Sequence, residues 1–196
     1  MEPGGFEKYL LIINAIGFIS FFINYLLYTY TEEGQIDKVL TVLSILGGSV
    51  GIILSMIIFD RKAEKGNMMS RVFVFSILII QIILVLIIKG YIAEQLTLNV
   101  VRFFRENKAI IIYLLIINIV AFITYAVDKY AAINRKSRIR IVTLLTLAFI
   151  GGSIGAIIAM YTLRHKTLQD YFTVGVPLIM VMQIFALFYL MNAPWR

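Results

Sequence analysis

Charged side chains that could bind a ligand gather at three places in the second half of the chain. Asp128-Lys129 and Arg138 lie on either side of a short polar stretch, and Arg164-His165-Lys166 follows the next apolar segment. Opposite charges that flank a short loop favour an ion pair between Asp128 and Arg138 that fixes the loop, while Lys129 could equally reach a lipid phosphate. Arg-His-Lys at a helix end could complement the helix dipole and hold a lipid phosphate or another anionic substrate.

The same residue types exclude several other chemistries. The chain has no cysteine and one histidine, His165, and no carboxylates cluster near it in the sequence. A zinc site needs more ligands than this, so we predict no metal. The sequence also shows no nucleophile–base pair and no glycine-rich nucleotide loop, so we expect no catalytic residue and no cofactor, and enzymatic chemistry is the weaker hypothesis.

The composition indicates the elements that must position these residues. Hydrophobic residues make up 61% of the chain and the mean hydropathy is +0.92. A helix needs roughly 20 apolar residues to cross a bilayer. Six segments are long enough, which predicts an all-α integral membrane protein with six transmembrane helices, near 9–29, 38–59, 71–91, 109–128, 140–162 and 172–192.

The chain carries an internal duplication. Residues 9–59 align with residues 113–163 without a gap, and 16 of the 51 paired positions are identical. Each copy holds three apolar segments, so the second copy should enter the membrane from the opposite side. This predicts two inverted three-helix repeats. We expect the first repeat at 1–98, a linker or interfacial helix at 99–108, and the second repeat at 109–196.

The distribution of basic residues gives an expected orientation and expected partners. With six crossings, 11 of the 18 Lys and Arg fall on the side of the N-terminus and seven on the other. The positive-inside rule then places both termini in the cytoplasm. The net charge of +7 is better explained by anionic lipid headgroups than by nucleic acid. A small ion, an anionic substrate and self-association remain possible partners.

Small residues recur four apart in the middle helix of each repeat. They place glycines on one helix face, where two backbones can approach closely and pack. The alternative is that Gly-Gly-Ser breaks the helix and exposes its backbone to an ion or substrate. Ile and Leu flank the motif and no proline is present, which favours continuous helices. The packing glycines are Gly47, Gly48, Gly51, Gly151, Gly152 and Gly155.

Four polar side chains fall near the centres of apolar segments, at Ser49, Ser153, Gln81 and Gln183. Such groups need partners because water is absent from hydrocarbon. They could surround a transport site between inverted repeats, or they could join helices by hydrogen bonds, and the second interpretation is favoured. Asn14 and Asn118 are expected to cap helices or to bond between them.

Two charged clusters of the second repeat lie at opposite ends of its middle segment. Arg140 and Arg164 are 24 residues apart, which is about 36 Å along a helix. They could share one site only if that helix folds back at its glycines. The first repeat lacks the Asp-Lys and Arg-His-Lys residues, so specific function is expected in the second.

The second repeat resembles the DUF1294 family of small bacterial membrane proteins over residues 110–190. The resemblance is carried by Asp128-Lys129, Arg138-Ile139, Leu144-Leu145, Gly151-Gly152-Ser153-Ile154-Gly155-Ala156, Met160, Arg164-His165-Lys166-Thr167 and Phe172. It implies that one short repeat is the family's unit, that the first repeat is a degenerate copy, and that the protein lies in a bacterial cytoplasmic membrane. The family carries no established activity.

Three functions therefore stand as hypotheses. The first is a small transporter or channel-like protein with a site between inverted repeats. The second is a lipid-headgroup-binding protein or intramembrane enzyme that uses the charged residues of the second repeat. The third is a structural or partner-binding membrane protein.

Overall fold

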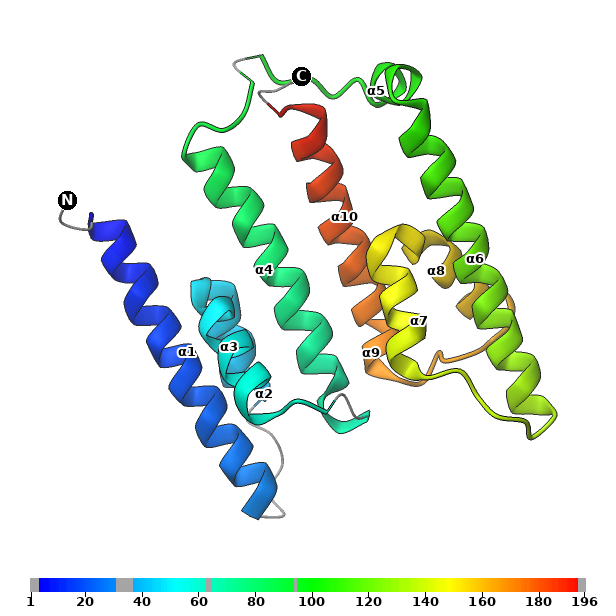
Figure 1. Ribbon diagram of the computed structural model, residues 1–196, viewed down its shortest axis with the longest axis horizontal. Coiled ribbons are helices and arrows are strands. Elements are labelled where there is room, and N and C mark those ends of the chain that lie inside the picture. Colours follow the sequence, from blue (N-terminus) through cyan, green and yellow to red (C-terminus); the bar gives the residue numbers. More distant parts are fainter. Residues whose placement is uncertain (1–3, 31–36, 63–64, 94, 194–196) are drawn as a thin grey trace. The chain divides into compact units, whose positions relative to one another are not determined.

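The computed structural model describes residues 4–30, 37–62, 65–93 and 95–193. Within these ranges every regular element is helical (Figure 1). The helices include six segments that are long and apolar enough to cross a membrane, as the apolar runs predicted. These are Gly5–Tyr30, Lys38–Phe59, Met68–Ile88, Lys108–Ile133, Ile141–Thr162 and Asp170–Met191.

The chain separates into two compact units, Met1–Ile82 and Ile83–Arg196, and each is described by itself. The first unit contains α1 (Gly5–Tyr30), α2 (Asp37–Leu43), the turn η1 (Ser44–Gly48), α3 (Ser49–Phe59), η2 (Lys65–Asn67) and most of α4 (Met68–Ile88). The second contains α5 (Val100–Glu106), α6 (Lys108–Ile133), α7 (Ile141–Leu147), the turn η3 (Ala148–Gly152), α8 (Ser153–Thr162), α9 (Asp170–Thr173) and α10 (Gly175–Met191).

The middle helix of each repeat is broken at its Gly-Gly-Ser motif. Gly47 has φ +109° and Gly151 has φ +125°, a left-handed conformation that glycine adopts without steric cost. One helix ends at this residue and a second begins directly after it, as at the left-handed glycine that commonly terminates a helix. The expectation of continuous helices is therefore wrong. A broken helix leaves backbone groups without intrahelical partners, and here other parts of the fold supply those partners.

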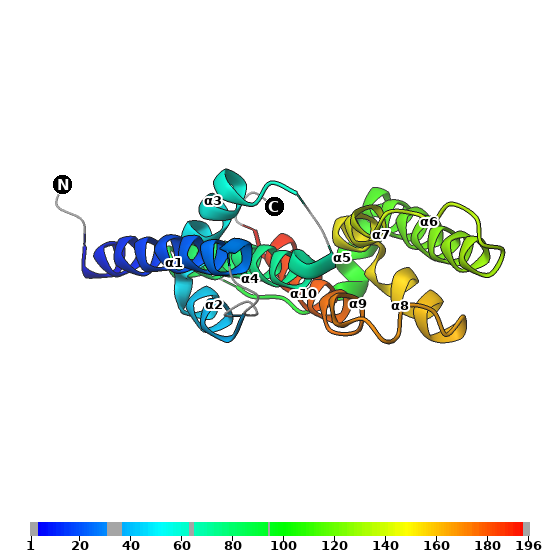
Figure 2. The same ribbon diagram turned by 90° about the horizontal axis from the view of Figure 1, so that it is seen from below.

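In the second unit the chain returns to the place where it left α6. The Ile139 N–H and the His165 ring both contact Asp128, near the C-terminal end of α6. Ile150, which lies between these two residues in the sequence, is near the other end of α6, where its carbonyl accepts a hydrogen bond from the Tyr113 hydroxyl. Asp128 and Tyr113 are 15 residues apart on one helix, or about 22 Å. The segment α7–η3–α8 is thus a helical hairpin that extends along most of α6 and comes back (Figures 1 and 2).

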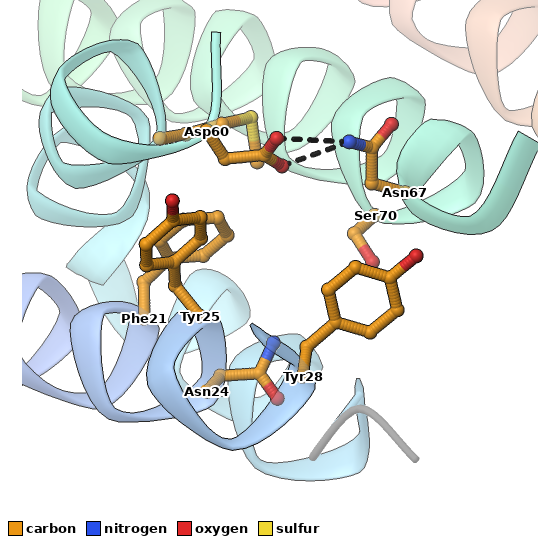
Figure 3. A pocket seen from close by; sticks show the side chains of 8 residues that line it. Phe21, Asn24, Tyr25, Tyr28, Asp60, Asn67 and Ser70 are labelled. Atoms are coloured by element: carbon orange, nitrogen blue, oxygen red, sulfur yellow. Dashed lines mark hydrogen bonds between the residues drawn. The ribbon is translucent and has the colours of Figure 1, made fainter. Parts of the chain in front are cut away.

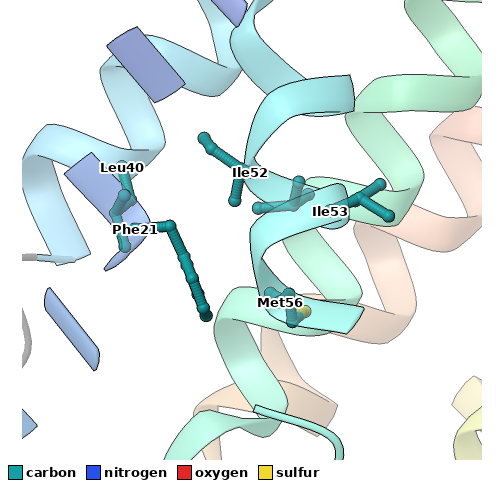
Figure 4. Packing of buried hydrophobic residues seen from close by; sticks show 6 residues of the cluster. Phe21, Leu40, Ile52, Ile53 and Met56 are labelled. Carbon is teal, nitrogen blue, oxygen red and sulfur yellow. The ribbon is translucent and has the colours of Figure 1, made fainter. Parts of the chain in front are cut away.

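The first unit repeats this arrangement. Tyr9 donates to the Leu46 carbonyl at the tip of the hairpin, and Phe22 packs against Phe59 at its base, with tilted rings whose centroids are 4.6 Å apart. Phe21 packs in one cluster with residues of both arms, namely Leu40, Ile52, Ile53 and Met56, together with Val74 of α4 (Figure 4). We call the end of each hairpin near Asp128 or Phe59 the base, and the glycine turn the tip.

The hairpins bear on the expected membrane crossings. Inverted repeats were expected from three crossings per repeat, whereas the middle segment of each repeat folds back to its own base. The outer surfaces keep a membrane character, since α1 and α6 expose large apolar side chains such as Leu11 (66%) and Leu115 (59%). A re-entrant segment is tolerated in hydrocarbon where its irregular backbone is covered by protein.

Candidate functional site at the hairpin base

Asp128 joins three segments of the second repeat. Its side chain is fully buried near the end of α6. One carboxylate oxygen accepts the Ile139 N–H at 3.0 Å. The other lies 2.7 Å from His165 Nε2 and 3.2 Å from Lys166 Nζ. A buried carboxylate is tolerated only when it is paired and hydrogen-bonded, and here these three donors satisfy it.

The turn after α8 delivers the two cations to this carboxylate. Arg164 has φ +46° and Lys166 has φ +64°, a region that costs side-chain-bearing residues about 1 to 2 kcal/mol each. The His165 N–H donates to the Met160 carbonyl at 3.0 Å and closes the turn. His165 and Lys166 point inward, whereas Arg164 is exposed.

Aromatic rings line the inner side of this cluster. Lys166 Nζ lies 5.4 Å from the centroid of the Phe172 ring, and Phe172 meets Tyr125 edge-on at 5.8 Å. Both rings are fully buried. A desolvated ammonium over a ring face gains roughly 2 kcal/mol, so the cluster holds its lysine by an ion pair and a cation–π contact together.

The expected ion pair between Asp128 and Arg138 does not form. The backbone of the next residue, Ile139, takes the carboxylate instead, and Arg138 is exposed. The reason is the hairpin, which brings His165 and Lys166 to Asp128. The condition for one shared site, a fold-back at the glycines, is therefore met.

Basic side chains surround the cluster on its exposed side. Lys129 is half-buried, and Lys136 lies 5.7 Å from the centroid of the Tyr130 ring. Among the described residues no carboxylate pairs with Arg138, Arg140 or Arg164. Nor do the described residues contain a group of three His, Cys, Asp or Glu able to hold a metal ion. The arrangement suits an anion better than a cation.

The polar residues of the apolar segments meet at the hairpin tips. Gln183 Nε2 donates to the Ala148 and Phe149 carbonyls at 2.7 and 3.1 Å, and Ser153 Oγ donates to Gln183 Oε1 at 2.5 Å. Asn118 Nδ2 donates to the Gly151 carbonyl at 2.9 Å. These side chains satisfy the carbonyls that the helix break frees.

The tip of the first repeat has the same construction. Gln81 donates to the Ser44 and Ile45 carbonyls at 2.5 and 3.2 Å, and Ser49 Oγ donates to the Ser44 carbonyl at 3.1 Å. The tip tyrosines, Tyr9 and Tyr113, were not singled out from the sequence. Their identity at a fixed offset in both copies was the available signal.

The glycines after each tip pack against the first helix of their own repeat. A β-carbon on Gly51 would lie 1.9 Å from the Asn14 backbone oxygen, and one on Gly155 would lie 2.0 Å from that of Asn118. In each repeat the same asparagine accepts the N–H of the glycine, at 2.8 and 2.7 Å. These glycines therefore serve contacts inside the repeat and are not free to pair with a second copy. Gly48 and Gly152 face the same helices.

The base of the first repeat is built differently. Asn24 occupies the position of Asp128 in the alignment and lines a small pocket with Tyr28, Ser70 and others (Figure 3). The carboxylate at the base of the first repeat belongs to Asp60, which pairs with Arg71 at 3.2 Å and accepts a hydrogen bond from Asn67 at 2.8 Å. The two repeats thus share the hairpin but not the charged cluster.

Fold and site together define a class: an all-helical polytopic protein of membrane type, built from duplicated helical hairpins, with a charged cluster at one hairpin base. The family profile described as "Protein of unknown function (DUF1294)" matches residues 118–172, which contain the second hairpin and its cluster. The "Uncharacterized protein YsdA" of Bacillus subtilis (strain 168) is 37% identical over 79 residues, which cover 39% of this chain and 89% of that protein. The chain belongs to the DUF1294 family. No solved structure matches it.

Proposed function

We propose that the second repeat binds phosphate-bearing anionic groups, foremost phospholipid headgroups, at its hairpin base. We call the buried Asp128 carboxylate with its partners Ile139, His165 and Lys166 the Asp128 clamp. This clamp carries the proposal, because it pairs His165 and Lys166 internally and leaves three arginines exposed around it, namely Arg138, Arg140 and Arg164. Guanidinium groups match the geometry of phosphate oxygens and bind them in pairs of hydrogen bonds.

The clamp explains why these three arginines act together. Arg138 and Arg140 flank Ile139, whose N–H is bound to Asp128, and Arg164 precedes His165, which is bound to the same carboxylate. The carboxylate thus fixes the two loops that carry them. A prearranged set of donors loses less conformational entropy on binding than three independent side chains would.

Lipid binding to purified protein in nanodiscs tests this proposal. The discs would contain phosphatidylcholine with a minor fraction of phosphatidylglycerol, and native mass spectrometry would count the retained lipids. Each basic residue at a membrane surface contributes about 1 kcal/mol, so the triple variant Arg138→Gln/Arg140→Gln/Arg164→Gln should weaken phosphatidylglycerol binding by up to roughly a hundredfold.

A matched triple variant provides the control. Lys8, Arg105 and Lys108 are exposed at the other ends of α1, α5 and α6, and their replacement by Gln changes the net charge equally. It should leave lipid retention within about twofold of the parent protein. Equal losses in both triple variants would mean that net charge alone attracts the lipid, and the proposed site would be wrong.

Transport is a second candidate function, favoured by the broken hairpins and their polar tips. The tip carbonyls of Ser44, Ile45, Ala148 and Phe149 accept hydrogen bonds from Gln81 and Gln183, so an ion would have to displace these amides. Flux of anions and cations into proteoliposomes tests this candidate. Gln183→Leu removes the amide that an ion would have to displace, so a flux that this variant leaves unchanged would exclude a route through the tip of the second hairpin.

A further inference from the structure

We infer that each repeat is inserted with its hairpin base at the cytoplasmic surface and its outer helix ends at the opposite surface. This replaces the expectation of inverted repeats with cytoplasmic termini. It follows from the path of the chain within each unit and from the charge at each base.

In the second unit the chain leaves on the side where it arrived. The residues that lead into α5 and α6 bind the residue that follows α10. Ala93 and Thr97 donate their N–H groups to the Asn192 carbonyl and side-chain oxygens at 2.8 and 2.7 Å, and Asn192 Nδ2 donates to the Thr97 carbonyl at 3.1 Å. The second repeat therefore crosses twice, once with α6 and once with α10, because the hairpin returns to its base.

In the first unit α1 and α4 also run in opposite directions (Figure 1). Arg71 in the first turn of α4 pairs with Asp60 at the hairpin base, and Gln81, further along α4, reaches the tip. The chain thus returns to the side where α1 began. Among the described residues of 89–107 no helix is long and apolar enough to cross a membrane, so we infer no crossing between the end of α4 and the start of α6.

The basic residues select the same side in both repeats. Counting the Lys and Arg whose side chains the structure describes, the base of the first repeat holds four (Lys38, Arg61, Lys62, Arg71) and its other end two (Lys8, Lys89). The base of the second holds seven (Lys129, Arg135, Lys136, Arg138, Arg140, Arg164, Lys166) and its other end three (Arg102, Arg105, Lys108). The two bases together hold 11 of these basic residues and the other ends hold five. The topology with six crossings divided all 18 Lys and Arg into 11 and seven.

The positive-inside rule then places both bases in the cytoplasm. Two repeats evaluated separately give the same answer, which two inverted repeats would not. If the proposed headgroup site is also correct, it faces the inner leaflet, where anionic lipids attract basic segments. That last step rests on the proposed function, whereas the orientation does not.

The chain contains no cysteine, so single-cysteine variants test the orientation directly. The exposed residues Lys38, Lys62, Ser137 and Leu168 flank the two hairpins, and Arg105 lies at the other end. Each would be replaced by Cys in the full chain, expressed in a bacterial host, and treated with a membrane-impermeant maleimide in spheroplasts and in inside-out vesicles.

We expect the four base positions to react only in inside-out vesicles and the Arg105→Cys variant only in spheroplasts. Continuous middle helices would place Ser137→Cys and Leu168→Cys on opposite sides and would overturn the inference. The inference would also be overturned if the two positions of each hairpin were labelled from one side, but the two hairpins from opposite sides. The nanodisc experiment reports lipid binding on either face, so failure of the headgroup site and failure of the orientation are distinguishable.

Discussion

Replacing Asp128 by asparagine should strongly destabilise the second repeat. The substitution keeps the shape of the side chain and removes its charge, which leaves the Lys166 ammonium without its anion at a site where that side chain is 8% exposed. The asparagine also has an NH2 group in place of one carboxylate oxygen, and this group cannot accept the hydrogen bonds that the oxygen accepted. Removing one partner of a buried ion pair costs about 3 to 5 kcal/mol.

The first repeat provides a matched comparison. Asp60 pairs with Arg71 at 3.2 Å, but the two side chains are 19% and 16% exposed and the pair lies near the hairpin end. The Asp60→Asn variant should therefore cost less, about 1 to 2 kcal/mol, because water compensates part of the lost attraction. Both values would be measured as shifts in the unfolding free energy during titration with SDS, followed by far-ultraviolet circular dichroism.

A double variant separates the charge effect from the loss of packing. In Asp128→Asn/Lys166→Met the unpaired ammonium is gone, so part of the lost stability should return, with a coupling energy of about 1 to 3 kcal/mol. If Asp128→Asn costs no more than Asp60→Asn and the double variant shows no coupling, the clamp does not hold the hairpin base and the reasoning above fails.

Three further substitutions test the remaining parts of the account. Gly155→Ala should destabilise the second repeat by about 3 kcal/mol or more, since its β-carbon would overlap the Asn118 carbonyl, whereas the exposed Ile154→Ala should cost under about 1 kcal/mol in the same SDS titration. Gln183→Leu removes the partner of two tip carbonyls and should cost about 1 to 3 kcal/mol, and an unchanged midpoint would show that the tip is satisfied in another way. Gly47→Ala should cost about 1 to 2 kcal/mol because the left-handed conformation disfavours a side chain, and a gain in stability would contradict the broken helix.

The apolar elements could be predicted from the sequence because length and hydropathy determine them. The expected segment 38–59 coincides with Lys38–Phe59, and the possible interfacial helix at 99–108 is a helix at Val100–Glu106, capped by the Asn99 side chain. Whether that helix lies on a membrane surface stays a prediction. The duplication and the family resemblance were also visible in the residues, and the family assignment is confirmed.

The helix break could not be predicted from local sequence because its partners are distant. Tyr113, Asn118 and Gln183 satisfy the carbonyls around Gly151 from two other helices. Without them, a glycine that follows Phe149-Ile150 in hydrocarbon favours a continuous helix, since each unpaired carbonyl would cost several kcal/mol. The residues of the charged cluster were identified from the sequence, but the contact of Asp128 with His165 and Lys166 was missed for the same reason: a straight helix separates them, and only the hairpin brings them together.

The distance between the two flanks of the second hairpin tests the central claim most directly. Spin labels on the exposed positions of Ser137→Cys/Leu168→Cys, measured by pulsed electron paramagnetic resonance in nanodiscs, report that distance in an otherwise cysteine-free chain. Both positions lie within three residues of a group bound to Asp128, so their α-carbons should be less than roughly 25 Å apart. A continuous helix over the same 31 residues would separate them by about 46 Å, and a distribution centred there would contradict the hairpin and the site built on it.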